Sequence, residues 1–237
     1  MVQQKPKSRD YKPRTRRVAT KHDEKKVAIE LVPRNERQND YLQALKHYSQ
    51  VVVFGPAGTG KTYCVSTFAA NQYHMKIIDK IVITRPHVAV GKDIGYLPGT
   101  LEEKSAPWAL PVLDVLEEHL GKGVVETGLK AGNIEVAPLA LMRGRSFKNA
   151  FIICDEAQNI SFHELKMLVT RVGEGSHLIL NGDLQQSDLK EGDGLSKIVH
   201  LIKKHMLPVP VVEFTTDDIV RSDMTKLWIE TFVKEKL

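Results

Sequence analysis

Cysteine is scarce in this sequence, because 237 residues contain only Cys64 and Cys154. Two cysteines cannot supply the disulfide framework of a small secreted domain, and these two do not have the spacing of a zinc site. The nine histidines include no pair at metal-ligand spacing with further ligands, and no serine, histidine and aspartate pattern indicates a nucleophilic hydrolase. We therefore expect both cysteines to be reduced packing residues, and we expect no zinc site.

Long hydrophobic runs are also missing. No apolar stretch approaches the length of about 18 residues that a membrane-spanning helix needs, and the charged N-terminus lacks the apolar segment of a signal peptide. We therefore expect a cytoplasmic protein with no membrane partner. A hydrophobic content of 42% over 237 residues is sufficient to bury a sizeable core, and a single globular domain accounts for it.

Aromatic residues make up only 6% of the chain, so a stacking platform for single-stranded nucleic acid is not indicated. Positive charge is concentrated in residues 1–26, where ten lysines and arginines stand against three acids, a net charge of +7 in a chain that carries +5. This segment has no apolar periodicity and one aromatic residue, Tyr11. We interpret it as a disordered basic tail that contacts nucleic-acid phosphates. The alternative is a solvated tail that only aids solubility.

The strongest motif present is G-x-x-x-x-G-K-T at 55–62, directly after an apolar strand at 51–54. Glycines in such a phosphate loop let backbone N–H groups close around phosphate oxygens, and the following helix directs its positive end at them. Lys61 is predicted to reach the β- and γ-phosphates, and the Thr62 hydroxyl is predicted to bind Mg²⁺. The predicted nucleotide-binding residues of the loop are Gly55, Pro56, Ala57, Gly58, Thr59, Gly60, Lys61 and Thr62.

Two carboxylates, Asp155 and Glu156, follow a second apolar strand at 151–154. Beside a phosphate loop, Asp155 is predicted to complete the Mg²⁺ site and Glu156 to orient the attacking water. The alternative is an acidic turn that caps the next helix.

A third motif, Leu180-Asn-Gly-Asp183-Leu-Gln-Gln186, ends the apolar strand 177–180. Ligands of parallel sheets bind beyond the carboxyl ends of the strands, so this motif is expected on the same edge as the other two. An uncharged glutamine suits γ-phosphate sensing, because it can donate to phosphate or orient water and then relax without leaving a buried charge. A surface turn is the alternative.

Strands made only of apolar residues alternate with helical segments along residues 27–237, which is typical of a parallel sheet covered on both faces. The sequence therefore predicts an α/β fold of the P-loop NTPase class, with one domain at 27–237 after the tail at 1–26. The glycine-rich segment 87–105 is expected to be a functional loop. The predicted strands are 27–32, 51–54, 81–84, 134–137, 151–154, 177–180 and 209–214, and the predicted helices are 38–48, 61–71, 107–120, 161–172, 193–204 and 222–234.

In order and spacing, the motifs resemble those of the PhoH family of ATPases over about residues 31–236. Most of these motifs are not shared by phosphate-loop proteins at large, so the resemblance is specific. The motifs that carry it are P-R-N-x-x-Q-x-x-Y at 33–41, GPAGTGKT at 55–62, TRP at 84–86, GYLPGTLEEK at 95–104, MRGRSF at 142–147, DEAQN at 155–159, GDLQQSDL at 182–189 and DIVRS at 218–222.

The resemblance implies a RecA-like core similar to the first motor lobe of superfamily 1 helicases, with ATP and Mg²⁺ as cofactors. It also implies a homo-oligomeric, hexameric ring and a role in RNA metabolism. By the same resemblance, Gln38 matches the adenine-reading glutamine of the helicase Q motif, and Gln186 matches the helicase γ-phosphate sensor. Some relatives carry an N-terminal PIN nuclease domain, which is not expected here because only the basic tail precedes the core.

Phosphoryl transfer commonly gains about 10³ to 10⁵ in rate from an arginine at the γ-phosphate, and two-lobed helicases supply it from the second lobe. With one lobe predicted, we expect an arginine on the far side of the domain to reach a neighbour's nucleotide in a head-to-tail ring. Arg221 is the predicted residue, because it lies just before the last helix. Arg85, Arg143 and Arg145 are rivals that act within one subunit, and a surface salt bridge is the alternative role of Arg221.

The main hypothesis from the sequence is a Mg²⁺-dependent ATPase of helicase-like type that acts on single-stranded nucleic acid, with RNA favoured over DNA. One alternative is an ATP-switched RNA-binding scaffold with negligible unwinding. Another is a phosphate-loop kinase for a small molecule, although kinases usually lack the paired DEAQ and GDxxQ motifs.

Overall fold

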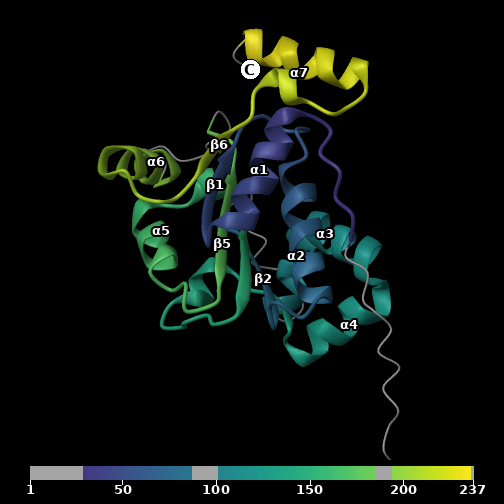
Figure 1. Ribbon diagram of the computed structural model, residues 1–237, viewed down its shortest axis with the longest axis vertical. Coiled ribbons are helices and arrows are strands. Elements are labelled where there is room, and N and C mark those ends of the chain that lie inside the picture. Colours follow the sequence, from purple (N-terminus) through teal and green to yellow (C-terminus); the bar gives the residue numbers. More distant parts are fainter. Residues whose placement is uncertain (1–28, 87–100, 185–193, 236–237) are drawn as a thin grey trace, which may run out of the picture.

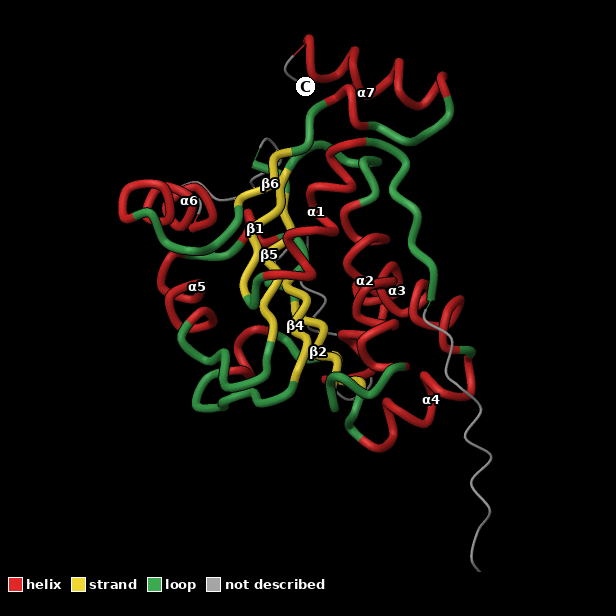
Figure 2. Tube along the Cα trace, viewed as in Figure 1, coloured by secondary structure: helices red, strands yellow, loops and turns green. Residues whose placement is uncertain are grey.

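The computed structural model describes residues 29–86, 101–184 and 194–235. The predicted basic tail at 1–26 and Gln186 lie outside the described residues. Six strands form one sheet in the order β3-β2-β4-β5-β1-β6, and every strand pair is parallel. Figure 2 shows β6, β1, β5, β4 and β2 one after another across this sheet. The strands are β1 (Gln50–Phe54), β2 (Lys80–Thr84), β3 (Ile134–Val136), β4 (Ala150–Cys154), β5 (His177–Gly182) and β6 (Val211–Glu213).

Helices cover both faces of the sheet (Figure 1). Successive strand residues point to opposite faces, so apolar side chains of the same strand pack against helices on both sides. On one face, Val51 and Val53 of β1 pack into a core formed with α1 to α4. On the other face, Val52 and Phe54 pack into a second core with α5 and α6. The predicted α/β class with a parallel sheet covered on both faces is therefore confirmed. The helices are α1 (Glu36–His47), α2 (Lys61–His74), α3 (Leu101–Leu120), α4 (Lys122–Ala131), α5 (Phe162–Val169), α6 (Gly194–His205) and α7 (Asp223–Glu235).

The strand order brings the three sequence motifs to one edge. Strand β5 lies between β1 and β4, with Phe54 opposite Gly182 and Cys154 opposite Leu180. The phosphate loop leaves the carboxyl end of β1, and Asp155 follows the carboxyl end of β4. The end of β5 therefore separates the loop from the acidic pair and lies beside both.

Several predicted elements differ from the structure. The described part of the predicted strand 27–32 carries no helix or strand, and the Ile29 N–H instead donates to the side chain of Asn71 on α2. The predicted loop 87–105 is wrong over 101–105, where α3 has already begun. The sequence predicted this helix to begin at residue 107, but it begins at Leu101 and continues through Pro107 and Pro111.

Helix α4 was not predicted, because the glycines of Lys122–Ala131 disfavour a helix in isolation. Gly128 packs so closely on β3 that a Cβ there would lie 2.8 Å from Cδ1 of Ile134. Tertiary packing therefore accounts for this glycine. The two cysteines are free and buried, as expected. No helix among the described residues is long and apolar enough to cross a membrane.

Candidate nucleotide site

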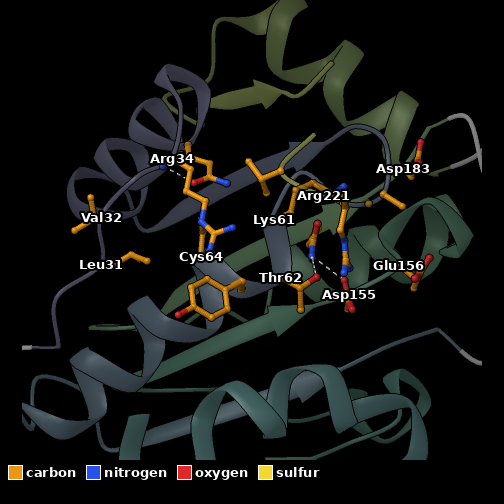
Figure 3. Close-up of a pocket in the computed structure, with 18 residues that line it drawn as sticks. Leu31, Val32, Arg34, Lys61, Thr62, Cys64, Asp155, Glu156, Asp183 and Arg221 are labelled. Atoms are coloured by element: carbon orange, nitrogen blue, oxygen red, sulfur yellow. Dashed lines mark hydrogen bonds between the residues drawn. The ribbon is translucent and has the colours of Figure 1, made fainter. Parts of the chain in front are cut away.

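A cleft of about 440 Å³ opens at the carboxyl edge of the sheet (Figure 3). It brings together residues from the phosphate loop, from the ends of β4 and β5, and from segments on either side of them. Most of the predicted site residues line this cleft: Gln38, Ala57, Gly58, Gly60, Lys61, Thr62, Asp155, Glu156 and Arg221. The other predicted residues of the phosphate loop, Gly55, Pro56 and Thr59, do not line it.

The phosphate loop ends at Gly60, which is the N-cap of α2. Its φ of 84° is in the left-handed region, which favours glycine, and no side chain caps the helix. The first N–H groups of α2 therefore have no side-chain cap at the point where the cleft begins. Uncapped N–H groups at a helix N-terminus favour the binding of an anion such as phosphate.

The Lys61 side chain folds back onto the loop that precedes it. Its Nζ donates to the carbonyl oxygens of Gly55 at 2.6 Å and Pro56 at 2.9 Å. Burial lowers the pKa of Lys61, while the charges of Asp183 and Asp155 act in the opposite direction. The ammonium group of Lys61 is therefore held by two carbonyl oxygens of the loop, and phosphate oxygens are able to replace these acceptors.

The two predicted metal ligands lie next to one amide group. The Nδ2 of Asn181 donates to Oγ1 of Thr62 at 3.0 Å and to Oδ1 of Asp155 at 2.8 Å (Figure 3). A hydroxyl and a carboxylate are the oxygen ligands that Mg²⁺ takes in nucleotide sites, so these residues fit the ion. Burial raises the pKa of Asp155 to about 6, and the charge of Glu156 acts in the same direction.

Glu156 has a backbone φ of 53° and ψ of 40°, a left-handed conformation that a residue with a Cβ rarely adopts. Its Oε1 forms an ion pair with Arg85 at 3.6 Å, and its Oε2 accepts a hydrogen bond from Gln158 at 2.6 Å. Such backbone outliers persist where surrounding contacts hold them, and they cluster at functional sites. The carboxylate is therefore held in place beside Asp155.

Arg221 corrects the sequence analysis in one respect. It lines the same cleft as its own phosphate loop, where a Cβ on Gly58 would lie 2.8 Å from its Cγ. The adjacent N–H of Val220 donates to the Gly58 carbonyl oxygen at 3.0 Å. The expectation that Arg221 lies on the far side of the domain is therefore wrong, because the chain after β6 returns to the phosphate loop.

The rival arginines divide into two groups. Arg85 lies at the end of β2 and pairs with Glu156, so it is close to the acidic pair. Arg145 is bound to Glu135 of β3, and Arg143 is exposed. None of these three arginines lines the cleft.

Gln38 is only 4% exposed and joins two parts of the site. Its Nε2 donates to the Thr59 carbonyl oxygen at 3.0 Å, and its Oε1 accepts from the Arg34 N–H at 2.9 Å. The glutamine thus connects the start of α1 to the phosphate loop. Its role in reading adenine stays a prediction.

Other residues of the site were not predicted. Leu31 and Val32 line the end of the cleft away from Asp155 and Glu156 (Figure 3). Asn181 lies in the motif at 180–186, in which the sequence predicted a role only for Gln186. Since polar residues at carboxyl strand ends face the ligand edge, the position of Asn181 next to Gly182 was the available signal.

Comparison with known proteins gives a family match over most of the chain. Residues 30–233 match the family model described as PhoH-like protein. Protein PhoH of Escherichia coli (strain K12) is 39% identical over 206 residues, which cover 85% of this chain and 58% of that protein. The PhoH-like protein of Bacillus subtilis (strain 168) is 40% identical over 200 residues, which cover 84% of this chain and 62% of that protein. The chain thus spans about three fifths of the length of these curated relatives.

Among solved structures, the crystal structure of Pif1 helicase from Candida albicans is similar with a TM-score of 0.45 and 15% sequence identity. The match covers 87% of this chain and 44% of that chain.

Proposed function

Because the chain belongs to the family of PhoH-like proteins, we propose that its cleft binds ATP with Mg²⁺ and hydrolyses it. The convergence of Thr62 and Asp155 on one amide group carries this proposal. These residues are 93 positions apart in the sequence and follow strands that do not pair with each other, yet their oxygens share one hydrogen-bond donor. Uncapped N–H groups of α2 lie next to them, as a triphosphate with its cation requires.

The chain's own groups divide the chemistry. Lys61 exchanges its carbonyl partners for β- and γ-phosphate oxygens. Thr62 and Asp155 would hold Mg²⁺, and the ion would neutralise negative charge on the phosphates. Glu156 accepts a proton from the attacking water, since its carboxylate is oriented from both sides by Arg85 and Gln158. In this proposal Glu156 is the general base, and it directly follows the proposed metal ligand Asp155.

An arginine of the same subunit completes the site in this proposal. Arg221 lies over Gly58 of its own loop, and its positive charge stabilises the negative charge on the transferring phosphoryl group. Gln186, which follows Asp183 at the end of β5, is proposed as the γ-phosphate sensor on the strength of the motif alone.

We further propose that hydrolysis is coupled to binding or remodelling of single-stranded nucleic acid, with RNA favoured over DNA. The +7 charge of residues 1–26 supports an electrostatic contact with phosphates. A homo-oligomeric, hexameric ring is proposed from the family resemblance, and the cytoplasmic location stays a prediction from the sequence.

The test is phosphate release by the whole chain with ATP and Mg²⁺, in the presence of single-stranded RNA, single-stranded DNA or neither. Salt must be fixed, because electrostatic affinity for nucleic acid changes by orders of magnitude with ionic strength. The proposal expects hydrolysis that RNA stimulates more than DNA. Tight RNA binding with negligible turnover would favour the scaffold, and phosphoryl transfer to an added acceptor would favour a kinase.

A further inference from the structure

Asn181 is the last residue but one of β5 and lies between the two predicted metal ligands. Only 1% of it is exposed. Its Nδ2 carries two hydrogens, and the nitrogen donates to Thr62 Oγ1 at 3.0 Å and to Asp155 Oδ1 at 2.8 Å. Each ligand oxygen thus occupies one of the two hydrogens of a single group.

The orientation of this amide follows from the charge of its partner. An ionised carboxylate only accepts hydrogen bonds, so the NH₂ end of Asn181 must face Asp155, because the opposite orientation would place two acceptors against each other. The Asn181 Oδ1 then points away, is buried, and has no partner among the described residues. A buried acceptor of this kind requires an explanation, such as a bound water or ion.

We propose that Asn181 is a positioning residue of the metal site. This inference rests on the proposed function: the amide nitrogen holds the Thr62 hydroxyl and the Asp155 carboxylate in the arrangement that a divalent cation needs. The positive end of the amide dipole also stabilises the buried Asp155 charge when no cation is bound. The unpartnered Oδ1 remains an acceptor for water, and Mg²⁺ keeps several of its waters.

The placement on β5 explains why this residue is suited to the task. The backbone of Asn181 is fixed in the centre of the sheet by its pairing opposite Val53 of β1. A side chain on a central strand is held more precisely than one on a loop. Groups that orient metal ligands in this way commonly change metal affinity by about 10- to 100-fold when they are removed.

The experiment measures metal and nucleotide binding separately. Mn²⁺ is the probe, and its Kd is determined by electron paramagnetic resonance in the presence of a non-hydrolysable ATP analogue, while the Kd of that analogue is measured again in EDTA. The variants are Asn181→Leu, which keeps the side-chain size without hydrogen bonds, and Asn181→Thr, which keeps one donor. Asp155→Asn removes a proposed ligand, and Asn133→Ala alters an exposed asparagine away from the cleft.

The proposal expects Asn181→Leu to weaken Mn²⁺ binding by about 10- to 100-fold, with an intermediate loss in Asn181→Thr. The affinity of the Asn181 variants for the analogue in EDTA should be unchanged. The Asn133→Ala protein should bind Mn²⁺ and the analogue as the unaltered protein does. Equal losses of analogue affinity with and without metal would overturn the proposal, because Asn181 would then act on the phosphate loop itself. If circular dichroism shows that Asn181→Leu does not fold, the same comparison is made with Asn181→Thr.

The outcomes distinguish a wrong role for Asn181 from a wrong proposed function of the cleft. If Asp155→Asn loses Mn²⁺ binding while both Asn181 variants retain it, the metal site stands and the role of Asn181 is wrong. If the unaltered protein binds no Mn²⁺ together with the analogue, the metal-dependent function and the role of Asn181 are both wrong.

Discussion

The side-chain amide of Gln158 donates a 2.6 Å hydrogen bond to the carboxylate of Glu156, and its carbonyl oxygen accepts from the Asp183 N–H at 3.0 Å. Gln158 lies in the 3-10 turn Ala157–Asn159 after β4, and Asp183 directly follows β5. One buried side chain thus ties the proposed base to the end of the neighbouring strand. This link matters because the left-handed backbone of Glu156 needs surrounding contacts to persist.

We predict that Glu156→Gln binds ATP with unchanged affinity and lowers kcat by about 10² to 10⁴. The carboxylate acts on water as the transition state forms, so its loss leaves ground-state binding intact. Equilibrium binding of a fluorescent ATP analogue and steady-state phosphate release measure the two quantities. Glu213→Gln, at an exposed position of β6, is the matched control. Normal turnover in Glu156→Gln would assign the base role to another group.

We predict that Gln158→Leu lowers kcat by up to about 10²-fold, because a misplaced base loses the geometry that catalysis requires. Its ATP affinity should not change, since Gln158 does not line the cleft. Gln43→Leu, on the exposed side of α1, is the control for the same chemical change. A Gln158→Leu protein with unaltered kcat would show that Glu156 is oriented without this hydrogen bond.

We predict that Arg221→Ala lowers kcat by about 10³ or more, as expected for an arginine at a transferring phosphate. Mixing it with Lys61→Ala should restore no activity, because the structure places Arg221 over its own phosphate loop. Subunit exchange must be proven, and Arg143→Ala, outside the cleft, should keep normal turnover. Recovery of activity on mixing would instead indicate that Arg221 serves a neighbouring subunit.

Deletion of residues 1–26 is predicted to leave basal ATP hydrolysis nearly unchanged and to weaken RNA binding. The segment carries a net charge of +7, and each phosphate it neutralises on a single strand contributes about 0.7 to the slope of log affinity against log salt. Fluorescence anisotropy with single-stranded RNA at several salt concentrations measures that slope. The same slope with and without the segment would limit its role to solubility.

Glu135 is predicted to make the free energy of unfolding vary with pH. A hydrogen bond from Arg145, with Lys80 also bonded at 2.7 Å, lowers the pKa of this carboxyl from 4.5 to about 2. Because the folded-state pKa is the lower one, the stabilisation is fully present above pH 4.5 and is lost as the pH falls towards 2.

Urea unfolding of the unaltered protein and of Glu135→Gln at several pH values tests this prediction. The difference in unfolding free energy should be about 1 kcal/mol or less near neutral pH, since the pair is partly exposed, and it should shrink in acid. Glu126→Gln, at an exposed position on α4, should show no such trend. A difference that does not vary with pH would indicate that Glu135 stabilises the fold by packing alone.

The sequence by itself determined the parts of this protein that depend on neighbouring residues. The phosphate loop, the start of the helix at Lys61 and the acidic pair after β4 are each encoded in one short stretch, and apolar strands indicated the parallel sheet. The rule that ligands lie beyond carboxyl strand ends then placed these motifs on one edge. Local signals failed at α4, where Gly128 is accepted only because it packs on Ile134.

The tertiary structure alone decided how distant residues meet. Asn181 joins Thr62 to Asp155 because β5 lies between β1 and β4, and strand order is set by packing of the whole sheet. Arg221 reaches its own phosphate loop because the chain turns back after β6, with Val220 bonded to Gly58. Contacts across more than a hundred residues depend on the burial of both cores together, so no short stretch of the sequence carries them.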